Sequence, residues 1–193
     1  SEVVTATTTD PSDDSIARAC KKLGVSVFRG SLQDVLDRFY QASRMHQADI
    51  IVRLTGDCPL IDPALIDDVV NALTRKKVDF ACNRLPPPFS RTYPIGLDVE
   101  ACTFNALEQA WYGAKEKFER EHVLPYLYAV PGRFSVLQLN HTTDLGHLRW
   151  TLDTPEDLVL LRRIYRYFQG RNDFSWLQVL QLQQQKLLLE YHV

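Results

Sequence analysis

Two aspartates, Asp57 and Asp153, each follow an apolar run whose residue types are typical of a β-strand. The first run, Ile50–Leu54, leads into Thr-Gly-Asp and then meets a proline, which makes the chain turn; the second, Leu148–Leu152, ends directly at Asp153. Ligands of open α/β sheets bind beyond the carboxyl ends of the strands. We therefore expect both carboxylates at one edge of one sheet, although they lie far apart in the sequence.

Paired carboxylates with few other ligands suit Mg²⁺, which keeps several waters and takes the rest of its shell from phosphate oxygens. Such a site serves transfer to or from a nucleoside triphosphate, because the metal neutralises the phosphates and stabilises the charge of the leaving pyrophosphate. We predict that Asp57 and Asp153 are catalytic and bind Mg²⁺. Taken singly, Asp57 could cap the turn before Pro59, and Asp153 could begin the helix at Pro155.

The composition is that of an ordinary globular protein, with 193 residues, 45% hydrophobic and 24% charged. A net charge of -2 argues against a nucleic-acid polymer or a membrane surface as the partner, since both require a cationic field. The four cysteines lie far apart and lack zinc-ligand spacing, which indicates reduced thiols. No signal peptide or membrane span is recognisable, so we expect a cytoplasmic protein.

The first half of the chain alternates predicted strands and helices. Strands are expected at residues 2–8, 25–28, 50–54 and 79–82, and helices are expected after Ser12–Asp14, from Ser31, and from Asp62-Pro63. This β-α-β-α-β-α-β order predicts an α/β fold in three layers, a mostly parallel sheet with helices on its faces.

The alternation breaks at residues 83–96, a loop with four of the ten prolines, which we interpret as one wall of a substrate site. Further strands are predicted at 97–102, 134–139 and 148–152, and further helices at 103–111, 118–130, 155–168 and after Ser175. We take residues 1–180 as a single domain and residues 181–193 as a C-terminal tail.

Five segments, in this order, carry a resemblance to a known family: Gly30-Ser31 through Asp34-Val35-Leu36-Asp37-Arg38, Arg53-Leu54-Thr55-Gly56-Asp57-Cys58-Pro59-Leu60, Tyr93-Pro94-Ile95-Gly96-Leu97-Asp98-Val99-Glu100, Glu119-Arg120-Glu121-His122-Val123 and Arg149-Trp150-Thr151-Leu152-Asp153-Thr154-Pro155-Glu156-Asp157-Leu158. Together they resemble the spore-coat-polysaccharide-type cytidylyltransferases, relatives of the enzymes that make CMP-Kdo and CMP-sialic acid. The resemblance runs from Val3 to about Phe168.

The resemblance implies the nucleotide-diphospho-sugar transferase fold, which is Rossmann-like, and a reaction in which a sugar hydroxyl attacks the α-phosphate of CTP. Asp57 and Asp153 match the family's metal-binding aspartates, and we assign Arg53, Thr55 and Gly56 to nucleotide binding. The acceptor-sugar side is matched by residues that we assign to substrate binding: Asp98, Glu100, Glu121, His122 and Arg149. The partners implied are CTP and an acidic or surface-polysaccharide sugar.

Several of these assignments have alternatives at the level of the sequence. His122 could be a structural histidine, and Asp98 and Glu100 could form a solvated strand face. Six arginines could pair either with phosphate or a sugar carboxylate, or with neighbouring acids: Arg29, Arg38, Arg53, Arg84, Arg91 and Arg149. Of these we assign only Arg53 and Arg149, which lie on predicted strands adjoining the aspartates. Ile95 stands where the family often has aspartate.

The family opens with a strand and a loop of the form A-R-x-x-S-x-R-L-P-x-K, whose amides and cations hold the triphosphate. The first residues of this chain match the part of the family that lies downstream of that segment. We expect the segment to be absent either from the protein or only from this chain. A sheet without its first strand would expose an unpaired edge, so we expect either dimerisation, as a homodimer, or poor solubility of the isolated fragment.

Two other functions fit the same sequence. One is a catalytically inactive fragment of the fold that serves as a binding or assembly module. The other is a glycosyltransferase that uses a nucleotide sugar, in which the acidic pair Asp98 and Glu100 would hold the metal instead of Asp57.

Overall fold

The computed structural model describes residues 1–185, which fold as two compact units. Unit 1 comprises Ser1–Ile51, Lys77–Phe80 and Ala101–Val136, and unit 2 comprises Val52–Lys76, Ala81–Glu100 and the chain from Leu137 onward. The expected single domain stays a prediction. Part of the expected tail lies outside the described residues, while residues 181–184 belong to the last helix.

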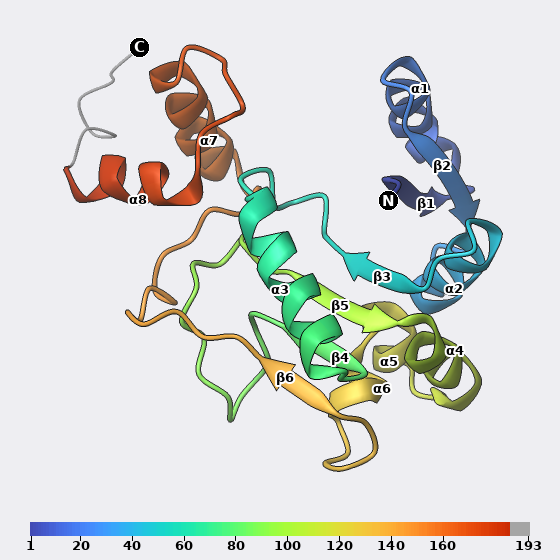
Figure 1. Cartoon of the computed structure of the whole chain (residues 1–193). Coiled ribbons are helices and arrows are strands. Elements are labelled where there is room, and N and C mark those ends of the chain that lie inside the picture. Colours follow the sequence, from blue (N-terminus) through green and yellow to red (C-terminus); the bar gives the residue numbers. More distant parts are fainter. Residues whose placement is uncertain (186–193) are drawn as a thin grey trace. The chain divides into compact units, whose positions relative to one another are not determined.

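Unit 1 begins with a parallel pair of strands, β1 (Val4–Thr8) and β2 (Ser26–Gly30), which lie side by side in Figure 1. The connection contains a short 3-10 helix, Pro11–Asp13, followed by α1 (Asp14–Lys22). The Asp13 carboxylate accepts hydrogen bonds from the hydroxyls of Thr7 and Thr8, at 2.7 and 2.6 Å. These bonds tie the end of β1 to the turn and lower the pKa of Asp13 to about 2.

The second sheet has the strand order β3-β5-β4-β6 (Figure 1). Its strands are β3 (Ile50–Arg53), β4 (Phe80–Cys82), β5 (Glu100–Thr103) and β6 (Val136–Gln138). The expected single sheet is therefore wrong in one respect, because β1 and β2 pair only with each other among the described strands. The α/β fold class itself is confirmed.

Strand β5 runs antiparallel to both of its neighbours. The Thr103 amide donates to the Asp79 carbonyl, at 3.0 Å, while the Asn83 amide donates to the Val99 carbonyl, at 3.2 Å, so residue numbers rise along β4 as they fall along β5. The same reversal relates β5 to β3, since the amide of Phe104 donates to the Asp49 carbonyl at 2.9 Å while Arg53, at the other end of β3, bonds to Glu100. The amino end of β5 consequently lies beside the carboxyl ends of β3 and β4.

The helices carry the capping residues that the sequence predicts at most of their starts. They are α2 (Val35–Met45), α3 (Pro63–Lys76), α4 (Phe104–Gly113), α5 (Lys117–His122), α6 (Pro125–Tyr128), α7 (Pro155–Tyr167) and α8 (Trp176–Gln184). Thr103, Thr154 and Ser175 cap α4, α7 and α8 through their hydroxyls. The expected start of α2 at Ser31 is wrong, because Asp34 is the N-cap and Leu32 is 64% exposed before the helix begins.

Two further predictions of secondary structure are wrong. The helical stretch expected at 118–130 is two short helices, α5 and α6, separated by Val123. Residues 148–152 form no regular strand but an isolated parallel bridge between Ile95 and Arg149. Two residues of this segment, Trp150 and Thr151, are nevertheless buried.

Within residues 1–185, no helix combines the length and the apolar character needed to span a bilayer.

Candidate active site

Asp57 lies in a turn, four residues beyond the end of β3 at Arg53. Its main-chain carbonyl accepts a hydrogen bond of 2.8 Å from the amide of Leu152, the residue that precedes Asp153. One backbone hydrogen bond within unit 2 thus brings together the two segments that carry the predicted metal-binding aspartates.

The Asp57 carboxylate makes few contacts in the structure. Among the described residues its one hydrogen-bond partner is the thiol of Cys58, with Sγ 3.6 Å from Oδ1. Burial raises the pKa of the Cys58 thiol to about 11, with a smaller contribution from the Asp57 charge, so the thiol stays protonated. Most of the lone pairs of Asp57 remain available to a ligand.

Asp153 is held by Arg149, whose Nη2 lies 2.7 Å from Asp153 Oδ2 and 2.9 Å from Asp157 Oδ2. Asp157 also accepts the backbone amides of Asp153 and Thr154, each at 2.9 Å. The hydrogen bond from Arg149 is the main cause of the lowered pKa of Asp157, and the backbone amides add to it. The bonds to Asp157 and then to Asp153 raise the pKa of Arg149. The caps of α7 are Thr154 and Asp157, so the Asp153 side chain, which is 48% exposed, is not needed for capping.

A second group of charged residues lies along the amino end of β5. Arg53 Nη1 lies 2.6 Å from Glu100 Oε2, and the Arg91 fork binds Asp98 through two bonds, of 2.5 and 2.9 Å. Glu100 is only 7% exposed, and burial raises its pKa while Arg53 lowers it. The alternative of a solvated strand face is therefore wrong, since both acids are paired.

The loop at residues 83–96 is anchored at both of its ends. The buried Asn83 side chain donates to the Leu97 carbonyl at 2.6 Å and accepts the Val99 amide at 2.8 Å. At the other end, Gly96 has a φ of +102°, and an added Cβ would lie 2.8 Å from the Trp150 carbonyl carbon, so only glycine fits there. The conformation of the loop is therefore fixed at both ends.

The remaining candidates for the nucleotide lie in the turn that carries Asp57. The Thr55 hydroxyl lies 3.2 Å from Cys58 Sγ, and Gly56 has no atom within 4 Å of the place a Cβ would take. The backbone at Gly56 is therefore open to close approach by a ligand. Arg53, at the end of β3, is already engaged by Glu100.

Glu121 and His122 belong to unit 1, at the carboxyl end of α5, and both are exposed. The His122 ring packs against Phe118, with ring centroids 4.5 Å apart. The next residue, Val123, has φ 73° and ψ -58°, and Leu124 donates to the His122 carbonyl at 2.9 Å, which is the strained γ-turn. Buried packing of Val123 holds this turn in place.

The residues present fit a magnesium ion. Within the described residues no group of three or more histidine, cysteine or acidic side chains is gathered to hold a metal. Mg²⁺ does not need one, since it is commonly bound through one or two carboxylates, with waters and phosphate oxygens completing the shell. Asp57 and Asp153 supply two carboxylates on adjacent segments.

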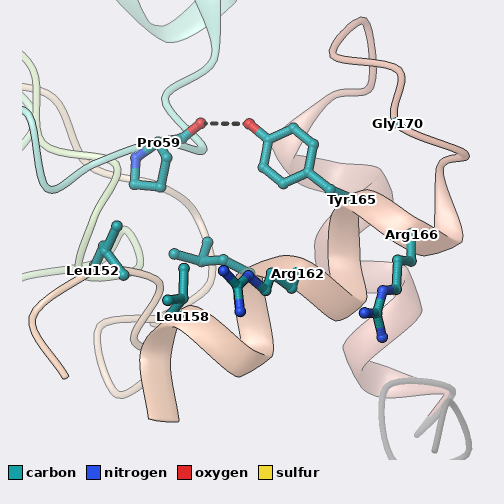
Figure 2. A pocket seen from close by; sticks show the side chains of 8 residues that line it. Pro59, Leu152, Leu158, Arg162, Tyr165, Arg166 and Gly170 are labelled. Atoms are coloured by element: carbon teal, nitrogen blue, oxygen red, sulfur yellow. Dashed lines mark hydrogen bonds between the residues drawn. The ribbon is translucent and has the colours of Figure 1, made fainter. Parts of the chain in front are cut away.

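A largely apolar cavity of about 510 Å³ adjoins these segments in unit 2 (Figure 2). It is lined by Pro59, Leu152, Leu158, Leu161, Arg162, Tyr165, Arg166 and Gly170. The Tyr165 hydroxyl donates to the Pro59 carbonyl at 3.0 Å, as the dashed line in Figure 2 shows. This bond ties α7 to the turn that carries Asp57.

Sequence reasoning missed one residue that shapes the site, Asn83. It follows β4 directly, and an asparagine in that place was a signal for a side chain that bonds to the neighbouring backbone. Arg91, one of the arginines named from the sequence as possible ligands of phosphate or a sugar carboxylate, is paired with Asp98 instead.

Comparisons with known proteins agree with this geometry. Residues 1–186 match the family model described as cytidylyltransferase. The uncharacterized protein MJ1063 of Methanocaldococcus jannaschii is 42% identical over 169 residues, which cover 86% of this chain and 67% of that protein. The spore coat polysaccharide biosynthesis protein SpsF of Bacillus subtilis is 31% identical over 176 residues, covering 90% of this chain and 70% of SpsF.

Two solved structures share the fold. A cytidylyltransferase from Leptospira borgpetersenii superposes with a TM-score of 0.89 at 34% identity, covering 99% of this chain and 79% of that one. CMP:2-keto-3-deoxy-manno-octonic acid synthetase, solved with CTP, superposes with a TM-score of 0.61 at 17% identity, covering 86% and 81%. The fold is that of an α/β cytidylyltransferase. The chain belongs to the cytidylyltransferase family.

Proposed function

We propose that this protein transfers CMP from CTP to an acidic or surface-polysaccharide sugar, with Mg²⁺ as its cofactor. In this reaction a sugar hydroxyl attacks the α-phosphorus of CTP. A bond forms between that oxygen and phosphorus, the bond from the α-phosphorus to the bridging oxygen breaks, and pyrophosphate leaves while the hydroxyl proton is released. The family match and the relationship to SpsF support this proposal.

The single observation that carries it is the hydrogen bond between Leu152 and Asp57, which brings the two aspartate segments together. Asp57 and Asp153 would hold Mg²⁺, which when bound neutralises the phosphates of CTP. Arg149 fixes the carboxylate of Asp153 before any ligand arrives, and Cys58 donates to that of Asp57. Each carboxylate is thus already held by a neighbouring side chain.

The other assignments follow from the site. The open backbone at Gly56, with Thr55 and Arg53 beside it, is proposed to contact the nucleotide. Exposed polar groups at Glu121 and His122 are proposed to contact sugar hydroxyls. Asp98, Glu100 and Arg149 are proposed to act on the sugar from within their ion pairs.

The glycosyltransferase alternative receives no support from the geometry, because arginines already pair with both Asp98 and Glu100. The inactive-module alternative is tested together with the main proposal. A homodimer and a cytoplasmic location stay predictions.

The test is release of pyrophosphate from CTP by the whole protein, with Mg²⁺ and eight-carbon or nine-carbon acidic sugars. Asp57→Asn is expected to reduce the rate roughly 100-fold or more, since it removes a charge that holds the metal. The matched control is Asp67→Asn, an exposed carboxylate of α3 in the same unit, which should leave the rate unchanged. Equal rates for Asp57→Asn and the unaltered protein would contradict the proposal and favour the binding module.

A further inference from the structure

The pairing of β4 with β5 sets the charged residues of this region on one face. Asn83 is opposite Val99 in the antiparallel ladder, which places position 82 opposite Glu100 and position 84 opposite Asp98. Side chains two residues apart along a strand point to the same side. Arg84 therefore shares a face with Asp98 and Glu100.

This face holds three guanidinium groups and two carboxylates. Arg53 pairs with Glu100 and Arg91 pairs with Asp98. The guanidinium of Arg84, a partly buried residue, has no hydrogen bond or ion pair to any residue that the structure describes. One positive charge on this face therefore has no carboxylate partner.

The other arginines of similar burial all have partners. Arg29 and Arg120 are bound to aspartates, and the more deeply buried Arg38 donates to the Ala6 carbonyl at 3.0 Å. Among the described residues, the buried side-chain polar atoms without a partner do not include any nitrogen of Arg84, so the five donors of its guanidinium are accessible to a ligand. Among these arginines of the described chain, Arg84 alone lacks an acceptor.

The backbone on both sides of Arg84 is fixed. Asn83 is 1% exposed and bonded at both ends of its amide, and Leu85 is 3% exposed. Arg84 is thus presented from a rigid position, which reduces the entropy lost when it binds a ligand.

The turn that carries Asp57 adjoins this face along the chain. Arg53, which pairs with Glu100, is the last residue of β3, and Asp57 lies four residues beyond it. Arg84 therefore belongs to the same part of unit 2 as the Asp57 turn.

We propose that Arg84 determines substrate specificity by binding the carboxylate of an acidic acceptor sugar. This inference rests on the proposed function. One uncompensated charge matches one carboxylate, and the planar fork of arginine fits it through two parallel hydrogen bonds. The phosphates of CTP are the other source of oxyanions, and the experiment separates the two.

The experiment compares Arg84→Gln, Arg84→Lys and the unaltered protein, with Arg75→Gln, an exposed arginine of α3, as the matched control. Pyrophosphate release is measured with 2-keto-3-deoxy-manno-octonic acid, with N-acetylneuraminic acid, and with the carboxamide of each. For Arg84→Gln we expect KM for the acids to rise roughly tenfold or more, with KM for CTP unchanged. KM for the carboxamides should be the same in both proteins, and Arg84→Lys should restore part of the loss.

A rise in KM for CTP rather than for the acid would overturn the inference, because it would assign Arg84 to a phosphate. The same rise in KM for the acid and for its carboxamide would also overturn the inference, since the carboxylate would then not be the group that Arg84 recognises.

Binding of the two acids, measured calorimetrically with and without CMP, separates this inference from the proposed function. If the unaltered protein binds an acid more tightly than Arg84→Gln but releases no pyrophosphate, the proposed function fails and the inference stands. If it turns over an acid that both proteins bind equally, the function stands and the inference fails. If it binds neither acid, the inference fails.

Discussion

Two partly buried arginines, Arg120 in unit 1 and Arg84 in unit 2, differ in whether their charges are paired. Arg120 gives Nε and Nη2 to Asp34, at 3.1 and 2.6 Å, and Nη1 to the Trp111 carbonyl, at 2.8 Å. The Trp111 indole in turn donates to Asp37 at 2.8 Å, so the network closes on α2. The guanidinium of Arg84 has no comparable bond to a described residue.

This difference indicates a structural role for Arg120 and a ligand-binding role for Arg84. Arg120 joins α5 to the amino end of α2, and its charge is matched within the unit. The face of β5 instead carries one more guanidinium than carboxylates. Removing a partner should therefore cost stability in the closed network, whereas removing Arg84 should cost ligand affinity.

The largest effect on stability is expected at the Arg53–Glu100 pair. Glu100→Gln leaves the Arg53 charge partly buried with no carboxylate, which should lower the free energy of unfolding by about 3 kcal/mol. Urea unfolding measures this, and the double change Arg53→Met/Glu100→Leu should recover most of the loss because it removes both charges. A Glu100→Gln protein as stable as the original would show that the β5 face tolerates a second unpaired arginine.

A smaller effect is expected at Asp34, which both caps α2 and pairs with Arg120. Asparagine caps a helix as well as aspartate does, so Asp34→Asn should lose only the ion pair, about 1 kcal/mol after allowance for its exposure. Asp34→Ala should lose the cap as well, about 2 kcal/mol in all. Equal losses in urea unfolding would mean that the cap contributes nothing.

The effect that is smallest near neutral pH, and that grows only in alkali, concerns Cys82, which lies opposite Glu100 on the β5 face. Burial, with added repulsion from Glu100 and Asp98, raises the pKa of this thiol from 9.0 to about 12. The unfolded chain loses the proton first, so stability should fall as pH rises from about 9 towards 12, by up to about 1.4 kcal/mol per pH unit. Unfolding at pH 8.5 and 10.5 should show a shallower decline for Cys82→Ala than for the original protein.

Much of the fold could be predicted from the sequence, because its signals are local. The cap at Thr154 with Pro155, the glycine that ends α1 and the apolar stripe of α3 each act within one turn of helix. The α/β class followed from their alternation. The prediction went wrong at Ser31, where a bend with its own side-chain bonds to Gln33 and Asp34 imitates a cap.

The candidate site was only partly predictable, because it depends on long-range pairing. Asp57 and Asp153 could be selected as strand-end acids, although neither turned out to end a regular strand. The ion pairs of Asp98 and Glu100 could not be foreseen, since they require β5 to enter the sheet antiparallel and between two earlier strands. No local pattern in residues 97–103 specifies that position.

The same placement of β5 governs the order in which the sheet can form. Strands β3 and β4 are not neighbours in the sheet; β5, the last of the three to leave the ribosome, lies between them. Until residue 103 has been synthesised, neither strand has β5 as its partner, so the edges of both stay open to chaperones and to one another. The joining of β3 to β4 therefore waits for one strand of four residues, and β6 completes the sheet later still.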